Sequence, residues 1–102
     1  MIEGFLTYLR SEKRYSELTV RAYGDDIRQF VLFCCGVTAS PTPEEEADIL
    51  RSFDPTLSEG NDLRGWIMHL TGTKNLSARS VNRKISSVKS LYRYLRKKGI
   101  VA

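Results

Sequence analysis

The residues with the clearest chemical potential form a basic run close to the C-terminal end of the sequence. Residues 77–98 contain eight Lys or Arg side chains and no Asp or Glu, and apolar residues recur among them at regular intervals. Cationic side chains bind phosphate oxygens, and such contacts supply much of the affinity of proteins for nucleic acids. This run is therefore a candidate nucleic-acid-binding helix.

Helical spacing of about 100° per residue divides the run into an apolar face and a polar face. The expected core stripe contains Val81, Ile85, Val88, Leu91, Tyr92 and Leu95. The polar face contains Arg79, Asn82, Arg83, Ser86, Lys89, Ser90, Arg93 and Lys97. Solvated helix faces usually mix charges, because opposite charges four residues apart stabilise a helix and like charges do not. Cations interleaved with small serines, which allow close approach to a phosphate backbone, favour nucleic-acid contact.

The formal net charge of +4 conceals an asymmetry between the two parts of the chain. Residues 1–62 hold 6 Lys or Arg against 12 acidic residues, a net charge of −6. Residues 63–102 hold 10 Lys or Arg and no acidic residue, a net charge of +10. This distribution predicts a polyanionic partner for the second part, with nucleic acid favoured over an acidic membrane surface.

The sequence contains no recognisable catalytic or metal-binding constellation. The single histidine, His69, lies between Met68 and Leu70 and is expected to be a packing or surface residue. The adjacent Cys34 and Cys35 cannot easily pair with each other, so we expect buried thiols of a reducing compartment. The glycines are scattered and form no phosphate-binding loop. We therefore expect no catalysis by this chain alone, no cofactor, no metal and no small-molecule substrate.

The length of 102 residues is that of one domain, so residues 1–102 are expected to form a single domain. No apolar stretch approaches the roughly 18 residues that span a bilayer, and we expect no membrane partner. The N-terminal residues have Glu3 near their start and no cationic segment, unlike a signal peptide. These features predict a cytoplasmic protein.

Apolar residues recur at helical rather than alternating spacing along the chain, so we expect an all-α fold. The expected helices cover residues 2–12, 17–35, 44–53, 63–70 and 78–98. Ser16, Asp62 and Ser77 are expected N-caps, because their side-chain oxygens can accept backbone N–H groups. Gly36 and Gly99 are expected to end the second and the last of these helices.

The helix expected over 17–35 shows a smaller version of the same division into faces. Its core stripe contains Val20, Tyr23, Ile27, Phe30, Val31 and Cys34. Arg21 and Arg28 lie off this stripe, and Thr19 adds a hydroxyl near the start of the helix. Two interpretations of Arg21 stay open at this point: contact with an anionic partner, or an ion pair with Asp25 four residues further on.

Two sequence motifs on these helices resemble a known family. Residues 16–30 match the pattern S-x-x-T-x-x-x-Y-x-x-D-I-x-x-F, and residues 77–95 match S-x-x-S-V-N-R-x-I-S-S-V-x-S-L-Y-x-Y-L. Together they resemble the N-terminal core-binding, SAM-like domain of tyrosine recombinases, which include phage integrases and Xer-type chromosome-dimer resolvases. The resemblance covers residues 2–36 and 62–100. The acidic connection between them is longer than usual, and nothing is carried over to it.

The resemblance implies a four-helix SAM-like orthogonal bundle that forms one half of a C-shaped clamp on duplex DNA. We expect one extra short helix in the insertion at 43–53. The DNA contacts that the resemblance implies are Thr19, Arg21, Arg79, Ser80, Arg83, Ser87 and Lys89. Helical spacing alone also places Arg79, Arg83 and Lys89 on the polar face, and it adds Ser86 to the candidate contacts. Ser80 and Ser87 lie to the side of that face.

In this family the catalytic Arg, Lys and His residues and the tyrosine nucleophile belong to a second, C-terminal domain. Residues 100–102 lie where the linker between the two domains would begin. We therefore expect a non-catalytic, DNA-binding part of an enzyme of DNA recombination and integration. Its expected partners are double-stranded DNA and, on DNA, other recombinase protomers of the full-length protein.

Two other classes of function fit the residues. A stand-alone DNA-binding regulator would need a short helix-turn-helix unit, which residues 69–85 could imitate, although the last helix is long for that role. A helical protein-interaction module would instead use the basic face to bind an acidic protein. Salt dependence and competition by unrelated DNA distinguish these classes.

Overall fold

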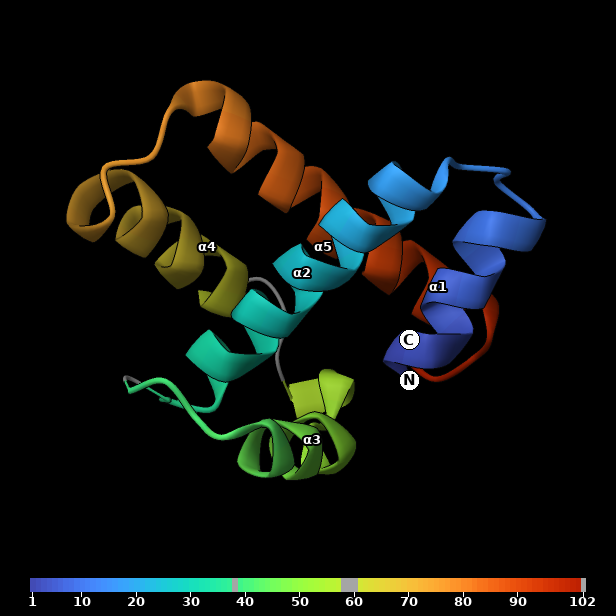
Figure 1. Cartoon of the computed structure of the whole chain (residues 1–102), viewed down its shortest axis with the longest axis horizontal. Helices are drawn as coiled ribbons and strands as arrows, with labels where there is room; N and C mark the ends of the chain where they lie inside the picture. Colours follow the sequence, from blue (N-terminus) through green and yellow to red (C-terminus); the bar gives the residue numbers. More distant parts are fainter. Residues whose placement is uncertain (38, 58–60, 102) are drawn as a thin grey trace.

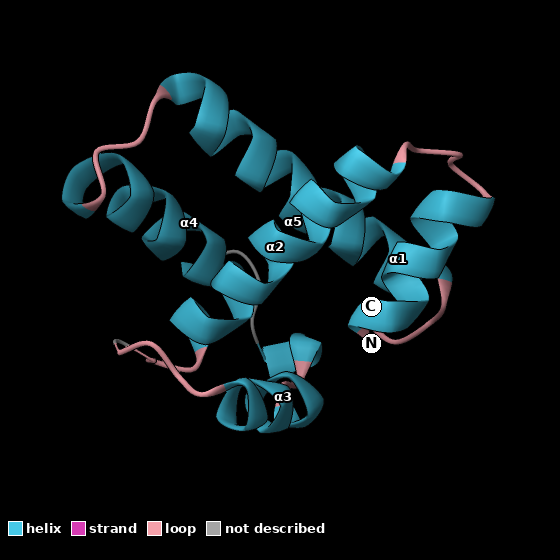
Figure 2. Cartoon of the chain, in the orientation of Figure 1, coloured by secondary structure: helices cyan, strands magenta, loops and turns pink. Residues whose placement is uncertain are grey.

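The computed structural model describes residues 1–37, 39–57 and 61–101, which are helical with short connections and contain no strand (Figure 2). The helices in chain order are α1 (Ile2–Ser11), α2 (Glu17–Cys34), α3 (Pro43–Ser52), the short 3-10 helix η1 (Pro55–Leu57), α4 (Asn61–Met68), the π-helical turn η2 (His69–Thr73) and α5 (Ala78–Lys97). The all-α prediction is confirmed, as is the extra helix in the acidic insertion.

Capping side chains set the starts of the two longest helices. The Ser16 hydroxyl accepts the backbone N–H of Thr19 at 3.2 Å, and the Ser77 hydroxyl accepts that of Ser80 at 3.3 Å. Two of the three predicted N-caps, Ser16 and Ser77, are thus confirmed. Gly36 and Gly99 follow the ends of α2 and α5 with φ angles of +72° and +75°, a left-handed conformation that glycine adopts without steric cost.

The region around α4 differs from the prediction. The helix begins at Asn61, so Asp62 lies in its first turn rather than at the N-cap. It also continues beyond residue 70 through η2 to Thr73. The Thr71 hydroxyl donates to the carbonyl oxygen of Ile67 at 2.9 Å, and the backbone N–H of Lys74 bonds the carbonyl of His69 at 3.0 Å. If the helix ended at residue 70, as predicted, the carbonyl oxygens of Ile67 and His69 would lack these hydrogen-bond partners.

Helices α2 and α5 form the centre of the bundle and cross each other, with α1 near one end of the pair and α4 near the other (Figure 1). Helix α3 packs against α2. The buried apolar residues come from α1, α2, α4, η2 and α5 and include Phe5, Leu9, Val20, Ile27, Phe30, Val31, Trp66, Leu70, Val81, Val88, Leu91 and Leu95. Their burial is the main stabilising contribution to the fold.

The predicted core stripe of α5 is buried, except that Ile85 is only half-buried. Tyr94 is buried too, although it lies outside that stripe, because its ring packs against the rings of Phe5 and Tyr8 on α1, with centroid distances of 5.7 and 5.1 Å. Among the described residues, no helix combines the length and apolar character needed to cross a membrane.

The histidine and the two cysteines differ in how deeply they are buried. His69 is half-buried with its ring 5.4 Å from that of Phe33, which confirms a packing role. Cys34 and Cys35 are thiols that do not form a disulfide. The expectation that both are buried is wrong: Cys34 is half-buried, and Cys35, the C-cap residue of α2, is exposed.

Candidate nucleic-acid interface

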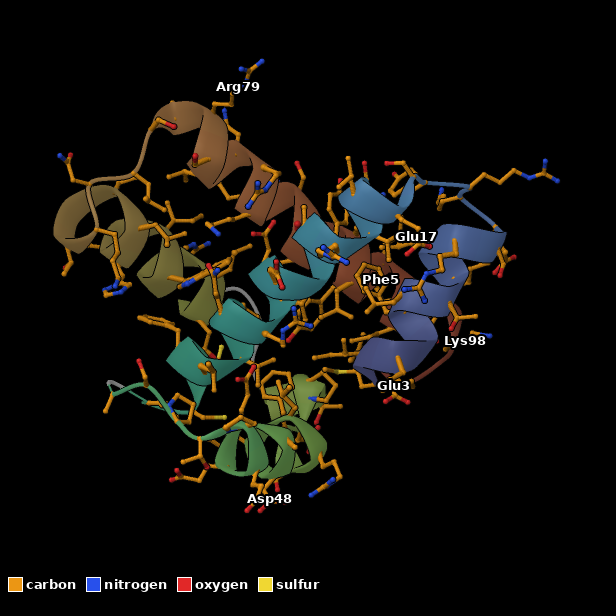
Figure 3. All side chains as sticks on the ribbon, viewed as in Figure 1. Glu3, Phe5, Glu17, Asp48, Arg79 and Lys98 are labelled. Carbon is orange, nitrogen blue, oxygen red and sulfur yellow. The ribbon has the colours of Figure 1, made fainter. Side chains whose placement is uncertain are left out.

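The N-terminal ends of α2 and α5 reach the same edge of the molecule, the upper edge in Figure 1. At this edge Arg79 projects from the start of α5, whereas Asp48 of the acidic helix α3 lies at the opposite edge (Figure 3). The start of the basic helix α5 and the acidic helix α3 therefore lie on opposite sides of the molecule. We call the residues on the basic side the candidate interface: Thr19 and Arg21 on α2, and Arg79, Ser80, Arg83, Ser86 and Lys89 on α5.

Exposed cations on α5 are the main feature of the candidate interface. Arg79, Ser86 and Lys89 are all exposed. Within the described residues, neither Arg79 nor Lys89 has a carboxylate within ion-pair distance. Because repulsion among these cations is not relieved by local pairing, an anionic ligand would be attracted to this face.

On α2, Arg21 is exposed and Thr19 is half-buried. The Thr19 hydroxyl lies 3.0 Å from the Ser16 hydroxyl. The structure does not form the alternative ion pair between Arg21 and Asp25, because Asp25 bonds to Arg28 instead. Arg28 also lies 3.8 Å from Glu46 and so links α2 to α3, away from the candidate interface.

The structure does not bring every predicted contact to the surface. Ser87 is fully buried, and its hydroxyl donates to Oδ2 of Asp26 at 2.8 Å. In this position it cannot contact a ligand at the surface of α5. Ser80 is half-buried, and its hydroxyl accepts a hydrogen bond from Ser77 at 3.1 Å.

A buried carboxylate organises the crossing of α2 and α5. Asp26 is fully buried and accepts hydrogen bonds from Arg83 Nε at 3.1 Å, Arg83 Nη2 at 2.8 Å and Lys84 Nζ at 2.9 Å, besides that from Ser87. Lys84 also donates to Oε1 of Gln29 at 2.7 Å. Every buried polar side-chain atom in the described part of the chain has a partner.

The charges in this cluster favour the ionised carboxylate. Burial is the largest single influence and raises the pKa of Asp26, but the hydrogen bonds from Arg83, Lys84 and Ser87 together outweigh it. The pKa of Asp26 therefore lies below its ordinary value. The hydrogen bond from Arg83 to Asp26 in turn raises the pKa of the guanidinium group. Both groups remain charged over the physiological pH range.

The sequence interpretation missed the roles of Asp26 and Lys84. It predicted an anionic partner from outside the chain for the basic run, but Arg83 and Lys84 share an internal partner, Asp26 on α2. A signal was present: Lys84 lies three residues after Val81 and four before Val88, so helical spacing places it on the apolar face. A charge on that face requires a partner from another helix.

These features describe an all-helical, SAM-like bundle with a basic edge. Over residues 1–100 the sequence matches the family described as phage integrase, N-terminal SAM-like domain, and the chain belongs to this family. The resemblance to the N-terminal domain of tyrosine recombinases is thereby confirmed.

Among curated proteins, the chain is similar to several named tyrosine recombinase XerC. That of Leptospira interrogans is 31% identical over 97 residues, which cover 95% of this chain and 27% of the relative. That of Staphylococcus saprophyticus is 36% identical over 92 residues, 90% of this chain and 26% of the relative. That of Chlorobaculum parvum is 34% identical over 103 residues, 99% of this chain and 28% of the relative. The chain thus spans about a quarter of the length of these relatives. No solved structure gives a significant match.

Proposed function

We propose that this chain binds duplex DNA as the N-terminal clamp domain of a site-specific tyrosine recombinase. The observation that carries the proposal is that Arg79 and Lys89 of α5 are exposed and have no acidic partner among the described residues, on the helix that starts at the edge where α2 also begins. The proposed contacts are Thr19, Arg21, Arg79, Ser80, Arg83, Ser86 and Lys89. Ser87 is left out of this set because it is buried.

The geometry of α5 suits this role. The major groove of B-DNA admits one α-helix, and the exposed residues Arg79, Ser86 and Lys89 extend over about three turns. The small side chain of Ser86 between the two cations allows the helix axis to approach the phosphate backbone. The first turn of α5 contains no acidic residue, so the positive end of its helix dipole adds to the attraction for phosphate.

The names of the relatives supply the biological context of the proposal. We infer that the strand-transfer chemistry belongs to the part of such proteins that lies outside the matched segment, and that this chain contributes binding rather than catalysis. Other recombinase protomers on the same DNA are the proposed protein partners. In this role the protein acts where the DNA lies, which in bacteria is the cytoplasm.

The test is fluorescence anisotropy with a labelled duplex of mixed sequence, titrated over a range of salt concentrations. Each phosphate neutralised by a cation contributes about −0.9 to the slope of log K against log salt. We expect the double variant Arg79→Ala/Lys89→Ala to lower the magnitude of the slope by about one to two. The matched control is Arg51→Ala, which removes an exposed cation from α3.

Two results would overturn the proposal: no binding of the wild-type chain to duplex DNA at low salt, or an equal loss of slope in the Arg51→Ala control. Displacement of the labelled duplex by polyglutamate at much lower concentrations than by unlabelled duplex would favour an acidic protein partner instead.

A further inference from the structure

The guanidinium group of Arg83 is held along one edge by a buried carboxylate. Its Nε and Nη2 atoms donate to the two oxygens of Asp26 at 3.1 and 2.8 Å. Asp26 is fully buried, and Lys84 and Ser87 fix the same carboxylate from other directions. The plane and direction of the guanidinium are therefore set before any ligand arrives.

The opposite edge of Arg83 is available to a ligand. A guanidinium carries five N–H donors in a fixed fork, of which Asp26 uses two. The remaining three, two on Nη1 and one on Nη2, point away from the carboxylate. The side chain is 49% exposed, and within the described residues no other acceptor bonds to it. Two of these N–H groups are parallel and can bond two acceptors in one plane.

Arg83 differs from its cationic neighbours on α5 because a carboxylate fixes its orientation. Arg79 and Lys89 have no carboxylate partner among the described residues and carry flexible, uncompensated charges, which suits contacts with phosphates. Arg83 shares Asp26 with Lys84, so one negative charge offsets only part of the two positive charges, and the attraction of Arg83 for phosphate is weakened but not removed. Its advantage is direction: a guanidinium fixed beforehand loses little conformational entropy when it binds a planar pair of acceptors.

We propose that Arg83 reads a guanine base in the major groove through Nη1 and Nη2, and that Asp26 is the positioning residue that fixes it. Guanine presents two coplanar acceptors there, N7 and O6, and their pairing with an arginine fork is the commonest specific contact of this kind. This inference rests on the proposed binding of duplex DNA. It adds that the chain prefers a guanine at one position of its site.

The experiment begins with the 102-residue chain and duplexes that it selects from a random pool. Each guanine of a selected duplex is then replaced in turn by 7-deazaguanine, which lacks N7, by 2-aminopurine, which lacks O6, and by inosine, which keeps both. We expect one position where the first two analogues weaken wild-type binding by about 5- to 100-fold and inosine has little effect.

Two variants assign this effect to residues. Arg83→Lys keeps the charge and loses the fork, so we expect it to bind duplex DNA with a similar salt slope but without sensitivity to 7-deazaguanine. Asp26→Asn is expected to retain salt-dependent binding and to lose most of the guanine preference, since Arg83 is no longer fixed. Helix content from circular dichroism, recorded at low temperature, shows whether each variant is folded.

The outcomes separate the two proposals. No salt-dependent binding of any duplex by the wild-type chain overturns the proposed function, and this inference with it. Binding of all duplexes with equal affinity, or a preference that is insensitive to 7-deazaguanine, overturns the guanine contact alone. Guanine sensitivity that survives unchanged in Arg83→Lys also overturns it. Loss of the preference in Arg83→Lys but not in folded Asp26→Asn overturns the positioning role of Asp26.

Discussion

Asp26 on α2 and Lys84 on α5 form an ion pair in the interior, with 2.9 Å between Oδ1 and Nζ and side-chain exposures of 0% and 8%. Removing two charges from water costs free energy, which their attraction offsets only if further hydrogen bonds satisfy the remaining polar atoms. Gln29, Arg83 and Ser87 supply those bonds. The pair thus lies where α2 and α5 cross, and the same carboxylate also holds Arg83 of the candidate interface.

Replacing the buried carboxylate should destabilise the protein strongly. In Asp26→Asn the ammonium group of Lys84 stays buried without its countercharge, and we expect the free energy of unfolding to fall by about 3–5 kcal/mol. The neighbouring Asp25 provides the control, because its ion pair with Arg28 is partly exposed and Asp25→Asn should cost at most about 1 kcal/mol. Urea unfolding followed by circular dichroism measures both, and equal losses would contradict the structural role of Asp26.

Stability should also depend on pH through Asp26. Its pKa is below the ordinary value in the folded protein, because the hydrogen bonds from Arg83, Lys84 and Ser87 outweigh the effect of burial, and it is about 3.9 in the unfolded chain. The unfolded state therefore takes up the proton first, and the stabilisation present above about pH 4 is lost as the pH falls through the folded-state pKa. We expect unfolding free energies at pH 5 and pH 3 to differ more in the wild type than in Asp26→Asn. A similar difference in both would mean that other carboxylates cause the acid sensitivity.

The parts of this fold that depend on local chemistry could be predicted from the sequence. Ser16 and Ser77 cap helices because their hydroxyls bond amides three residues away, and the periodic spacing around Val88 identifies a buried face. The bonds of Asp26 to residues of α5 span 57 to 61 residues of sequence, and no local pattern specifies such a partner. The resemblance implied Ser87 as a DNA contact, and nothing local in the sequence revealed that Asp26 is the partner of Ser87 and of Lys84.

Lys84 and Lys89 should separate stability from DNA affinity. Lys84→Met keeps the volume of a buried side chain but removes a hydrogen bond to a charged group, which should lower the free energy of unfolding by about 1.5–3 kcal/mol. Because Lys84 is buried, the salt slope of DNA binding should not change. Lys89→Met should show the reverse, with stability within about 0.5 kcal/mol and a slope smaller in magnitude by about 0.9. A loss of slope in a folded Lys84→Met variant would show that Lys84 reaches the DNA.

A close contact between α1 and α5 gives a further prediction. A methyl group added at Gly4 would lie 2.7 Å from the hydroxyl oxygen of Tyr94, a distance that forces one of the two groups to shift. The Tyr94 ring is buried and packs against the rings of Phe5 and Tyr8, so its movement is restricted. The helix-propensity gain of about 1 kcal/mol that alanine has over glycine should therefore not appear in Gly4→Ala.

Removing the Tyr94 hydroxyl should restore that gain. We expect Gly4→Ala to lower the thermal midpoint in the wild type and to raise it in the Tyr94→Phe background, so that the two substitutions couple favourably by about 1 kcal/mol or more. Gly65→Ala on α4 is the control, because its methyl group would meet the Phe33 ring at an ordinary contact distance of 3.7 Å and should stabilise the protein in both backgrounds. Additive effects of Gly4→Ala and Tyr94→Phe would mean that the hydroxyl does not limit how closely the N-terminal turn of α1 approaches α5.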